Sequence, residues 1–237
     1  MRTLCLAIVL SMASFGLAQQ TSAAAPHQSP HTASSAKPSA DEVWANLMAG
    51  NGRFVSGTPR SRDLVSLRKK LAAGQSPNVI ILSCSDSRVP PELIFDQSLG
   101  DIFVVRTAGN VADPVALGSI EYAVDHMHSP LLLVLGHQKC GAVSAACSGE
   151  KMPSANLDAI MKKIDPAVTR ARANAKSEDL IEFAIKENVH QSAEDVLANS
   201  EIVRNAVKAH KLTVIEAEYQ FDTGKVVRLN PGMGADN

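Results

Sequence analysis

Three short apolar runs, at residues 78–83, 101–105 and 131–135, limit the folds that this chain can adopt. Stretches with helical spacing separate these runs, such as residues 114–128, which carry Val115, Ile120 and Val124. Short apolar runs with helices between them are typical of strands that are buried on both faces of a parallel sheet. We therefore expect one α/β domain, built on a mainly parallel sheet that is flanked by helices.

The remaining elements of the expected domain lie at its two ends. Ser39 and Asp41 are candidate caps for a helix that runs to about residue 54, and a basic helix should follow at residues 63–73. Two long helical stretches are expected over residues 156–175 and 178–210. A last strand over residues 212–218 should turn at residues 222–225 into residues 226–229. The sequence thus predicts a helical N-terminal arm and a C-terminal hairpin.

The first 25 residues have the pattern of a secretory signal peptide. Arg2 gives a positive start, residues 4–17 are apolar or small, and small residues follow at 18 and 23–25. The apolar run is shorter than the roughly 20 residues of a membrane span, although an uncleaved anchor is the alternative. Residues 26–40 have the composition of a flexible linker, and residues 41–237 would form the single domain. We expect a periplasmic or secreted protein that has no membrane association after signal cleavage.

Charge and cysteine content exclude two other classes of protein. The chain has 23 Lys and Arg residues against 24 Asp and Glu residues, so it has no excess of positive charge with which to bind nucleic acid. Its four cysteines are too few for a disulfide scaffold at this length. Cys147 lies seven residues after Cys140; on one helix the axial rise of about 10.5 Å would be too long for a disulfide. We expect Cys147 to be a free, buried thiol.

Two of the apolar runs end at residues that bind metals. The first run is followed by Cys84, and the third by His137 and Cys140. Because sites assemble at the carboxyl ends of parallel strands, these side chains should meet there. Two thiolates and one imidazole are a good ligand set for zinc, with one coordination position left over. Each residue alone is more often part of a core, but the two motifs together favour a metal site.

An acidic and a basic residue follow the first of these cysteines. Asp86 and Arg88 would form either an ordinary salt bridge in a turn or, in a tight loop, a bidentate pair. The second reading would fix a carboxylate beside the metal site.

Three segments of this chain resemble the β-class carbonic anhydrases: C-S-D-S-R-V-P-P-E, V-V-R-T-A-G-N and G-H-Q-K-C-G-A-V. The resemblance runs from about Asp41 to the C-terminal hairpin and implies the β-carbonic anhydrase fold. It implies reversible hydration of CO₂ to bicarbonate and a proton, by attack of a zinc-bound hydroxide. One Zn²⁺ per subunit would be held by Cys84, His137 and Cys140, and Asp86 and Arg88 would be the catalytic pair.

The resemblance also indicates which type of site this chain has. In the gated type, the aspartate becomes the fourth zinc ligand, a state associated with a Trp three residues before the first cysteine. Here that residue is Ile81, so we expect the open, plant-like type, in which Asp86 would ligate zinc only in a closed state. In this family some pocket residues enter from a neighbouring subunit, which implies a homodimer or homotetramer. The implied substrate-binding residues are Gln75, Phe103, Tyr122 and Gly141.

Two other functions remain open at this point. One is a related zinc enzyme on the same fold that hydrolyses carbonyl sulfide or carbon disulfide. The other is a non-catalytic, zinc-stabilised binding module. Asp86 and Arg88 argue against the second function, because a structural zinc site favours four protein ligands and has no need of such a pair.

Overall fold

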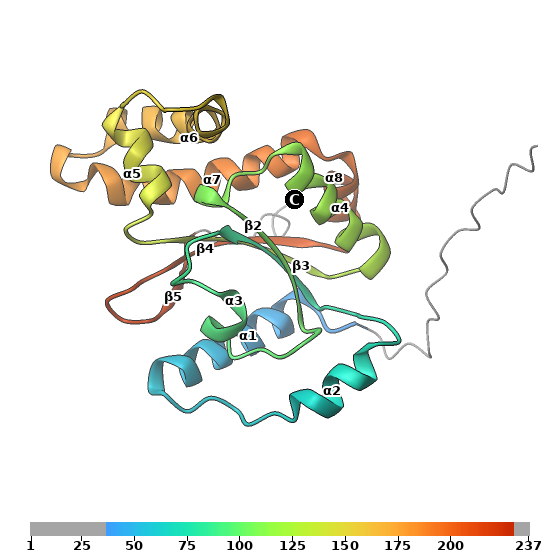
Figure 1. Ribbon diagram of the computed structural model, residues 1–237. Helices are drawn as coiled ribbons and strands as arrows, with labels where there is room; N and C mark the ends of the chain where they lie inside the picture. Colours follow the sequence, from blue (N-terminus) through green and yellow to red (C-terminus); the bar gives the residue numbers. More distant parts are fainter. Residues whose placement is uncertain (1–36, 230–237) are drawn as a thin grey trace, which may run out of the picture. The chain divides into compact units, whose positions relative to one another are not determined.

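The computed structural model describes residues 37–229, so the predicted signal peptide and most of the predicted linker lie outside the described residues. A five-stranded sheet with the strand order β2-β1-β3-β4-β5 forms the centre of the fold (Figure 1). The first four strands are parallel, and β5 is antiparallel to β4. The strands are β1 (Val79–Cys84), β2 (Ile102–Thr107), β3 (Leu131–His137), β4 (Thr213–Tyr219) and β5 (Val226–Arg228). The predicted α/β class and C-terminal hairpin are therefore confirmed.

Helices cover both faces of the sheet (Figure 1). One face packs against α1 and α3, through side chains such as Ile81 and Leu133. The other packs against α4, α7 and α8, through side chains such as Ile80 and Leu132. Helices α5 and α6 pack on α7. The helices are α1 (Ala40–Ser56), α2 (Leu64–Leu71), α3 (Pro91–Ile94), α4 (Pro114–Met127), α5 (Gly141–Ser148), α6 (Ala155–Asn174), α7 (Leu180–Asn199) and α8 (Glu201–Lys208), with 3-10 turns η1 (Ala108–Asn110) and η2 (Ser177–Asp179).

The N-terminal helix begins at one of its two predicted caps and ends two residues beyond the expected residue 54. The Ser39 side chain accepts a hydrogen bond from the Glu42 N–H, and the Glu42 carboxylate accepts one from the Ser39 N–H. This reciprocal capping box satisfies two N–H groups that the first turn leaves without helical partners. The helix ends at Gly57, whose φ of 68° suits a residue without a side chain. The predicted helical arm is confirmed.

Two expectations about the elements are wrong. Strand β2 is not buried on both faces, because it lies at the edge of the sheet; five of its six residues are partly exposed. The stretch expected as one helix divides at Ser200 into α7 and α8. Ser200 leaves the helical conformation and caps α8, its hydroxyl accepting a hydrogen bond from the Val203 N–H at 3.1 Å. Among residues 37–229, we find no helix with the length and apolar character that crossing a membrane requires.

Candidate metal centre and active site

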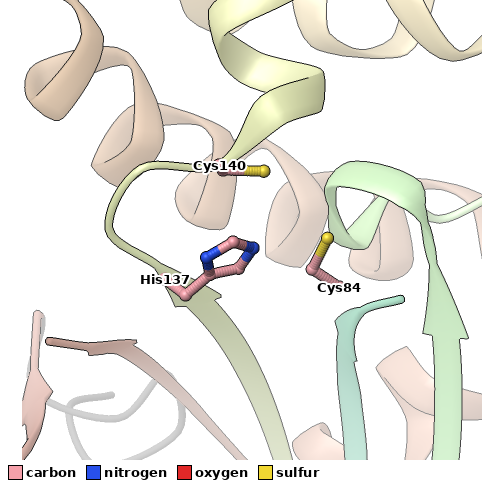
Figure 2. Close-up of side chains that lie close together, drawn as sticks. All are labelled: Cys84, His137 and Cys140. Carbon is pink, nitrogen blue, oxygen red and sulfur yellow. The ribbon is translucent and has the colours of Figure 1, made fainter. Parts of the chain in front are cut away.

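The pairing of the strands brings three distant side chains together. Strands β1 and β3 are parallel neighbours, so their carboxyl ends meet at one edge of the sheet. Cys84 ends β1, His137 ends β3, and Cys140 caps α5 after a short loop. Figure 2 shows the three side chains pointing toward one another. Their ligand atoms all lie within 4.8 Å of one another, and all three residues are buried.

The imidazole of His137 presents one ring nitrogen to the two sulfur atoms. Its Nδ1 lies 2.8 Å from the carbonyl oxygen of Gln138, which fixes Nδ1 as the donor and leaves the lone pair on Nε2. Nε2 is buried and has no hydrogen-bond partner among the described residues. Burial works to lower the pKa of His137, but the sulfur of Cys84 outweighs it, so that the pKa is raised. The surroundings of Nε2 therefore favour a positive charge there.

The two cysteines form a pair that holds one proton between them. A hydrogen bond from Cys140 is the main cause that lowers the pKa of Cys84, and the same contact, with burial, raises the pKa of Cys140. The Gly109 N–H also donates to the Cys84 sulfur, at 3.3 Å. A divalent cation would stabilise both thiolates at once. Two sulfurs and one unpartnered imidazole nitrogen fit Zn²⁺ and leave one coordination position over.

Asp86 and Arg88 form the bidentate pair that was one of the two expected readings. Arg88 Nε donates to Asp86 Oδ1 at 2.9 Å, and Arg88 Nη2 donates to Oδ2 at 2.7 Å. The hydrogen bonds from Arg88 are the main reason that the pKa of Asp86 is lowered to about 2. Asp86 Oδ2 lies 3.9 Å from His137 Nε2. A carboxylate that is ionised at neutral pH therefore stands at the edge of the cluster.

Two further side chains support the site and were not predicted. Arg106 donates to the carbonyl oxygens of Cys84 and Asp86, at 2.9 and 2.6 Å. Phe221 meets the His137 ring edge-on at 5.7 Å, and the Arg88 guanidinium carbon lies 4.4 Å from the centre of the Phe221 ring. The only sequence signal for Phe221 is its place in the hairpin that follows β4, the strand beside His137.

The four predicted substrate-binding residues divide into two groups. Gly141 follows Cys140 directly, as the first residue of α5. The other three lie near the amino ends of the strands. Gln75 is exposed and precedes β1. Phe103 lies opposite Ile80 at the start of β2, and the ring of Tyr122 is 6.2 Å from the ring of Phe103. Four residues of β2, about 13 Å, separate Phe103 from the position opposite Cys84. Within one chain, these three residues do not meet the metal cluster.

Comparison with known proteins decides the family. A family model described as carbonic anhydrase matches residues 79–226, which include all three clustered side chains. A solved β-carbonic anhydrase from Coccomyxa, in complex with acetazolamide, has the same fold, with a TM-score of 0.63 and 27% identity over 82% of this chain and 85% of that one. The chain belongs to the β-carbonic anhydrase family.

Other relatives support the enzyme class and the fold. This β-carbonic anhydrase is 41% identical to carbonic anhydrase 2 of Mycobacterium tuberculosis over 189 residues, which cover 78% of this chain and 90% of that protein. One of two tetrameric β-carbonic anhydrases of Sordaria macrospora has the same fold, with a TM-score of 0.64 and 24% identity over 81% of this chain and 98% of that one. The chain is thus a carbonic anhydrase, an enzyme that hydrates CO₂.

Proposed function

We propose that this β-carbonic anhydrase uses one Zn²⁺ per chain, held by Cys84, His137 and Cys140, for the reversible hydration of CO₂ to bicarbonate and a proton. The observation that carries this proposal is the buried, unpartnered Nε2 of His137 within 4.8 Å of two sulfur atoms. Zinc held there supplies a nucleophile at neutral pH, because a metal lowers the pKa of the water that it binds.

Asp86 is the catalytic residue in this proposal, and Arg88 is its positioning residue. The carboxylate accepts a hydrogen bond from the O–H of the nucleophile, so that a lone pair rather than a hydrogen points at the carbon of CO₂. Arg88 fixes the carboxylate by two side-chain contacts and one backbone contact, at 2.9, 2.7 and 2.9 Å. Because both oxygens of Asp86 are already bonded to Arg88, the pair supports the open type of site, in which Asp86 is not a ligand. Gly141, at the first turn of α5, would offer its N–H to an oxygen of bicarbonate.

We also propose that Gln75, Phe103 and Tyr122 complete the site from a second copy of the chain, so that a homodimer is the smallest active unit. The separation of these residues from the cluster within one chain supports this arrangement. Their exposure supports it as well: Phe103 lies on an edge strand, and Tyr122 is 45% exposed. Gln75 would then donate to a CO₂ oxygen on which negative charge develops, beside an apolar wall of two rings.

A mixed-dimer experiment tests the second proposal. One chain carries Asp86→Asn and the other carries Gln75→Ala, and the two are co-expressed with different affinity tags. If Gln75 acts across the interface, one site in each mixed dimer has both native residues, and half of the native activity should return. Mixed dimers no more active than the two parent variants would place Gln75 outside the partner's site.

We propose that the enzyme works outside the cytoplasm, after removal of residues 1–25. The positive start and the apolar run over residues 4–17 support this proposal. N-terminal sequencing of the protein from a periplasmic or culture fraction tests it. Recovery of the intact N-terminus in the cytoplasmic fraction alone would contradict it.

Stopped-flow measurement of CO₂ hydration tests the main proposal. Protein stripped of metal should be no faster than buffer, and one equivalent of Zn²⁺ should restore turnover. The same preparation is offered carbonyl sulfide and carbon disulfide. Zinc-loaded protein that hydrolyses either compound but leaves CO₂ hydration at the rate of buffer would replace this proposal by the related activity.

A further inference from the structure

A buried asparagine on α7 is connected to the metal cluster through one residue of the turn η1. Asn188 is 1% exposed, and it lies outside both ligand motifs. We propose that Asn188 is a positioning residue of the metal centre: its side-chain amide holds Gly109 so that the Gly109 N–H donates to the sulfur of Cys84. This inference rests on the proposed function, because it assigns a role toward the metal held there.

Gly109 takes part in both contacts, one through each of its backbone polar groups. Asn188 Nδ2 donates to the Gly109 carbonyl oxygen at 2.8 Å. The Gly109 N–H donates to Cys84 Sγ at 3.3 Å. Figure 2 shows the turn after β2 curling beside the Cys84 sulfur. Because the carbonyl is tethered, the orientation of this short turn, and with it the N–H, depends on α7.

The turn has a backbone conformation that requires support. Gly109 has a φ of 69°, a backbone conformation that residues with a side chain rarely adopt, so that glycine is favoured at this position. Asn110, which follows it, also has a positive φ, of 49°. The Asn110 side chain donates to Ser192 Oγ at 3.2 Å, one turn along α7 from Asn188. Two contacts from one face of α7 therefore hold the turn over the sulfur.

A contribution to the stability of the fold does not explain well why a buried asparagine stands at position 188. Its Oδ1 is buried and has no hydrogen-bond partner among residues 37–229. A buried amide with an unbonded oxygen costs free energy that an apolar side chain of similar shape would not. The contribution of the amide is therefore local, through its bond to Gly109.

A hydrogen bond to a thiolate has a defined effect on a metal. The N–H draws electron density from the sulfur, so that the sulfur donates less charge to the ion and the ion remains a stronger Lewis acid. Residues that hold ligands in this indirect way typically change metal affinity or activity by about 10–100-fold when they are removed. Asn188 thus sets how strongly Cys84 donates, although it touches neither the metal nor the substrate.

The first test uses the native chain loaded with an NMR-active isotope of cadmium. A hydrogen bond to a metal-bound sulfur transmits scalar coupling, so the Gly109 amide proton should be split by the metal. Metal uptake without such a coupling would overturn the first step of the inference and leave the proposed function standing. Failure to take up any metal would remove the proposed function, and this inference with it.

The second test compares Asn188→Leu with a matched buried asparagine, Asn51→Leu. Asn51 is 2% exposed and donates to the carbonyls of Ile94 and Gly224, far from the ligand motifs in sequence. In the Co²⁺-loaded protein, Asn188→Leu should shift the sulfur-to-cobalt charge-transfer band to lower energy, because the sulfur then donates more charge. It should also weaken zinc binding about 10-fold, because the turn that packs over the Cys84 sulfur is no longer held in place. Asn51→Leu should lower the melting temperature and leave the band unmoved. If the charge-transfer band of Asn188→Leu does not move, and its zinc affinity equals that of Asn51→Leu, then Asn188 does not position the metal centre.

Discussion

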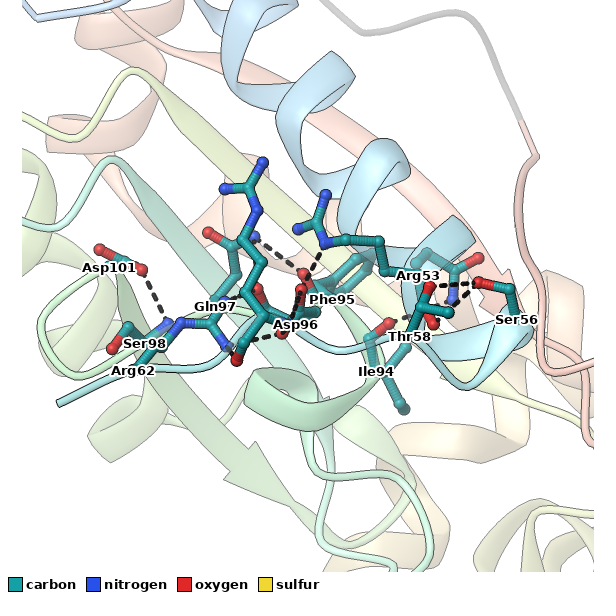
Figure 3. Close-up of polar contacts among 12 residues, drawn as sticks. Arg53, Ser56, Thr58, Arg62, Ile94, Phe95, Asp96, Gln97, Ser98 and Asp101 are labelled. Carbon is teal, nitrogen blue, oxygen red and sulfur yellow. Dashed lines mark hydrogen bonds and ion pairs between the residues drawn. The ribbon is translucent and has the colours of Figure 1, made fainter. Parts of the chain in front are cut away.

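The two ends of the parallel sheet each bury a charged cluster, but only one of them is complete within the chain. Near the amino ends of β1 and β2, the carboxylate of Asp96 accepts hydrogen bonds from Arg53, Arg62 and the Arg60 N–H (Figure 3). Burial works to raise the pKa of Asp96, but the arginines outweigh it and hold the pKa at about 2. Both oxygens of this buried anion are bonded, although Arg53 Nη2 has no partner among the described residues.

The cluster at the carboxyl end of the sheet differs in the hydrogen-bond partners of its buried atoms. There His137 Nε2 has no hydrogen-bond partner among the described residues, and the sulfurs of Cys84 and Cys140 hold one proton between them. The amino-end cluster surrounds its one carboxylate with two arginines of the same chain, whereas the carboxyl-end cluster leaves a buried ring nitrogen without a hydrogen-bond partner among the described residues. The comparison shows how the two clusters differ: at the amino end the chain itself supplies the counter-charge, and at the carboxyl end the side chains could hold a metal ion.

The largest effect should come from removing a ligand. Cys140→Ser should reduce bound zinc from about one per chain to a small fraction, and CO₂ hydration should fall to the rate of buffer, because serine is a poor zinc ligand. Metal analysis and stopped-flow kinetics measure both effects. Cys147→Ser is the matched control, since Cys147 is a buried, free thiol outside the cluster. Equal metal loss in the two variants would mean that Cys140 is no more a metal ligand than Cys147.

The next effect should separate catalysis from metal binding at the same end of the sheet. Asp86→Asn should lower kcat by about 10²–10³-fold, because an amide can turn its N–H₂ group rather than an acceptor toward the nucleophile. Zinc content should stay near that of the native enzyme. Asp222→Asn is the control, since Asp222 is an exposed acid that pairs with Lys139 close to the ligand loop. Native activity in Asp86→Asn would contradict the mechanism.

At the amino end, the expected effect is on stability. Asp96→Asn should lower the free energy of unfolding by about 3 kcal/mol, because two arginines lose the charge that they surround in a buried cluster. Zinc content per folded chain should not change. Urea unfolding measures the loss, and Asp158→Asn, in an exposed pair with Lys162, should be close to the native protein. Loss of metal from folded Asp96→Asn would show that the two ends are not independent.

The smallest effect is the pH dependence that Asp96 contributes at the amino end. The pKa of Asp96 is about 2 in the folded state, below the roughly 3.9 of an unfolded chain. The unfolded state therefore binds more protons between these values, so the stabilisation is complete above about pH 4 and is lost as the pH falls toward 2. The stability difference between native protein and Asp96→Asn should shrink over that range. A constant difference would mean that Asp96 does not titrate as described.

The sequence predicted the parts of this molecule that depend on local pattern. The apolar runs before Cys84 and His137 each form a buried strand, and the metal cluster follows because those two strands are parallel neighbours. The helix cap is likewise a local signal: of the two candidates, Ser39 and Asp41, the structure shows Ser39 as the cap.

Other features depend on contacts between distant segments, which no local pattern reveals. Strand β2 looks like a central strand in sequence, and only the strand order makes it an edge. The break at Ser200 has no glycine or proline, and its hydroxyl also bonds to Glu121 on α4. Phe221 reaches the site from the turn after β4, and Asn188 from α7, through pairing and packing that the motifs do not encode.

X-ray absorption at the zinc edge of the purified protein shows which atoms bind the metal. We expect one zinc per chain, with two sulfur ligands at about 2.3 Å and nitrogen or oxygen ligands at about 2.0–2.1 Å. The Cys140→Ser variant should lose this signal, and Cys147→Ser should keep it. Native protein without stoichiometric zinc, or a zinc shell without sulfur, would mean that Cys84, His137 and Cys140 do not hold zinc.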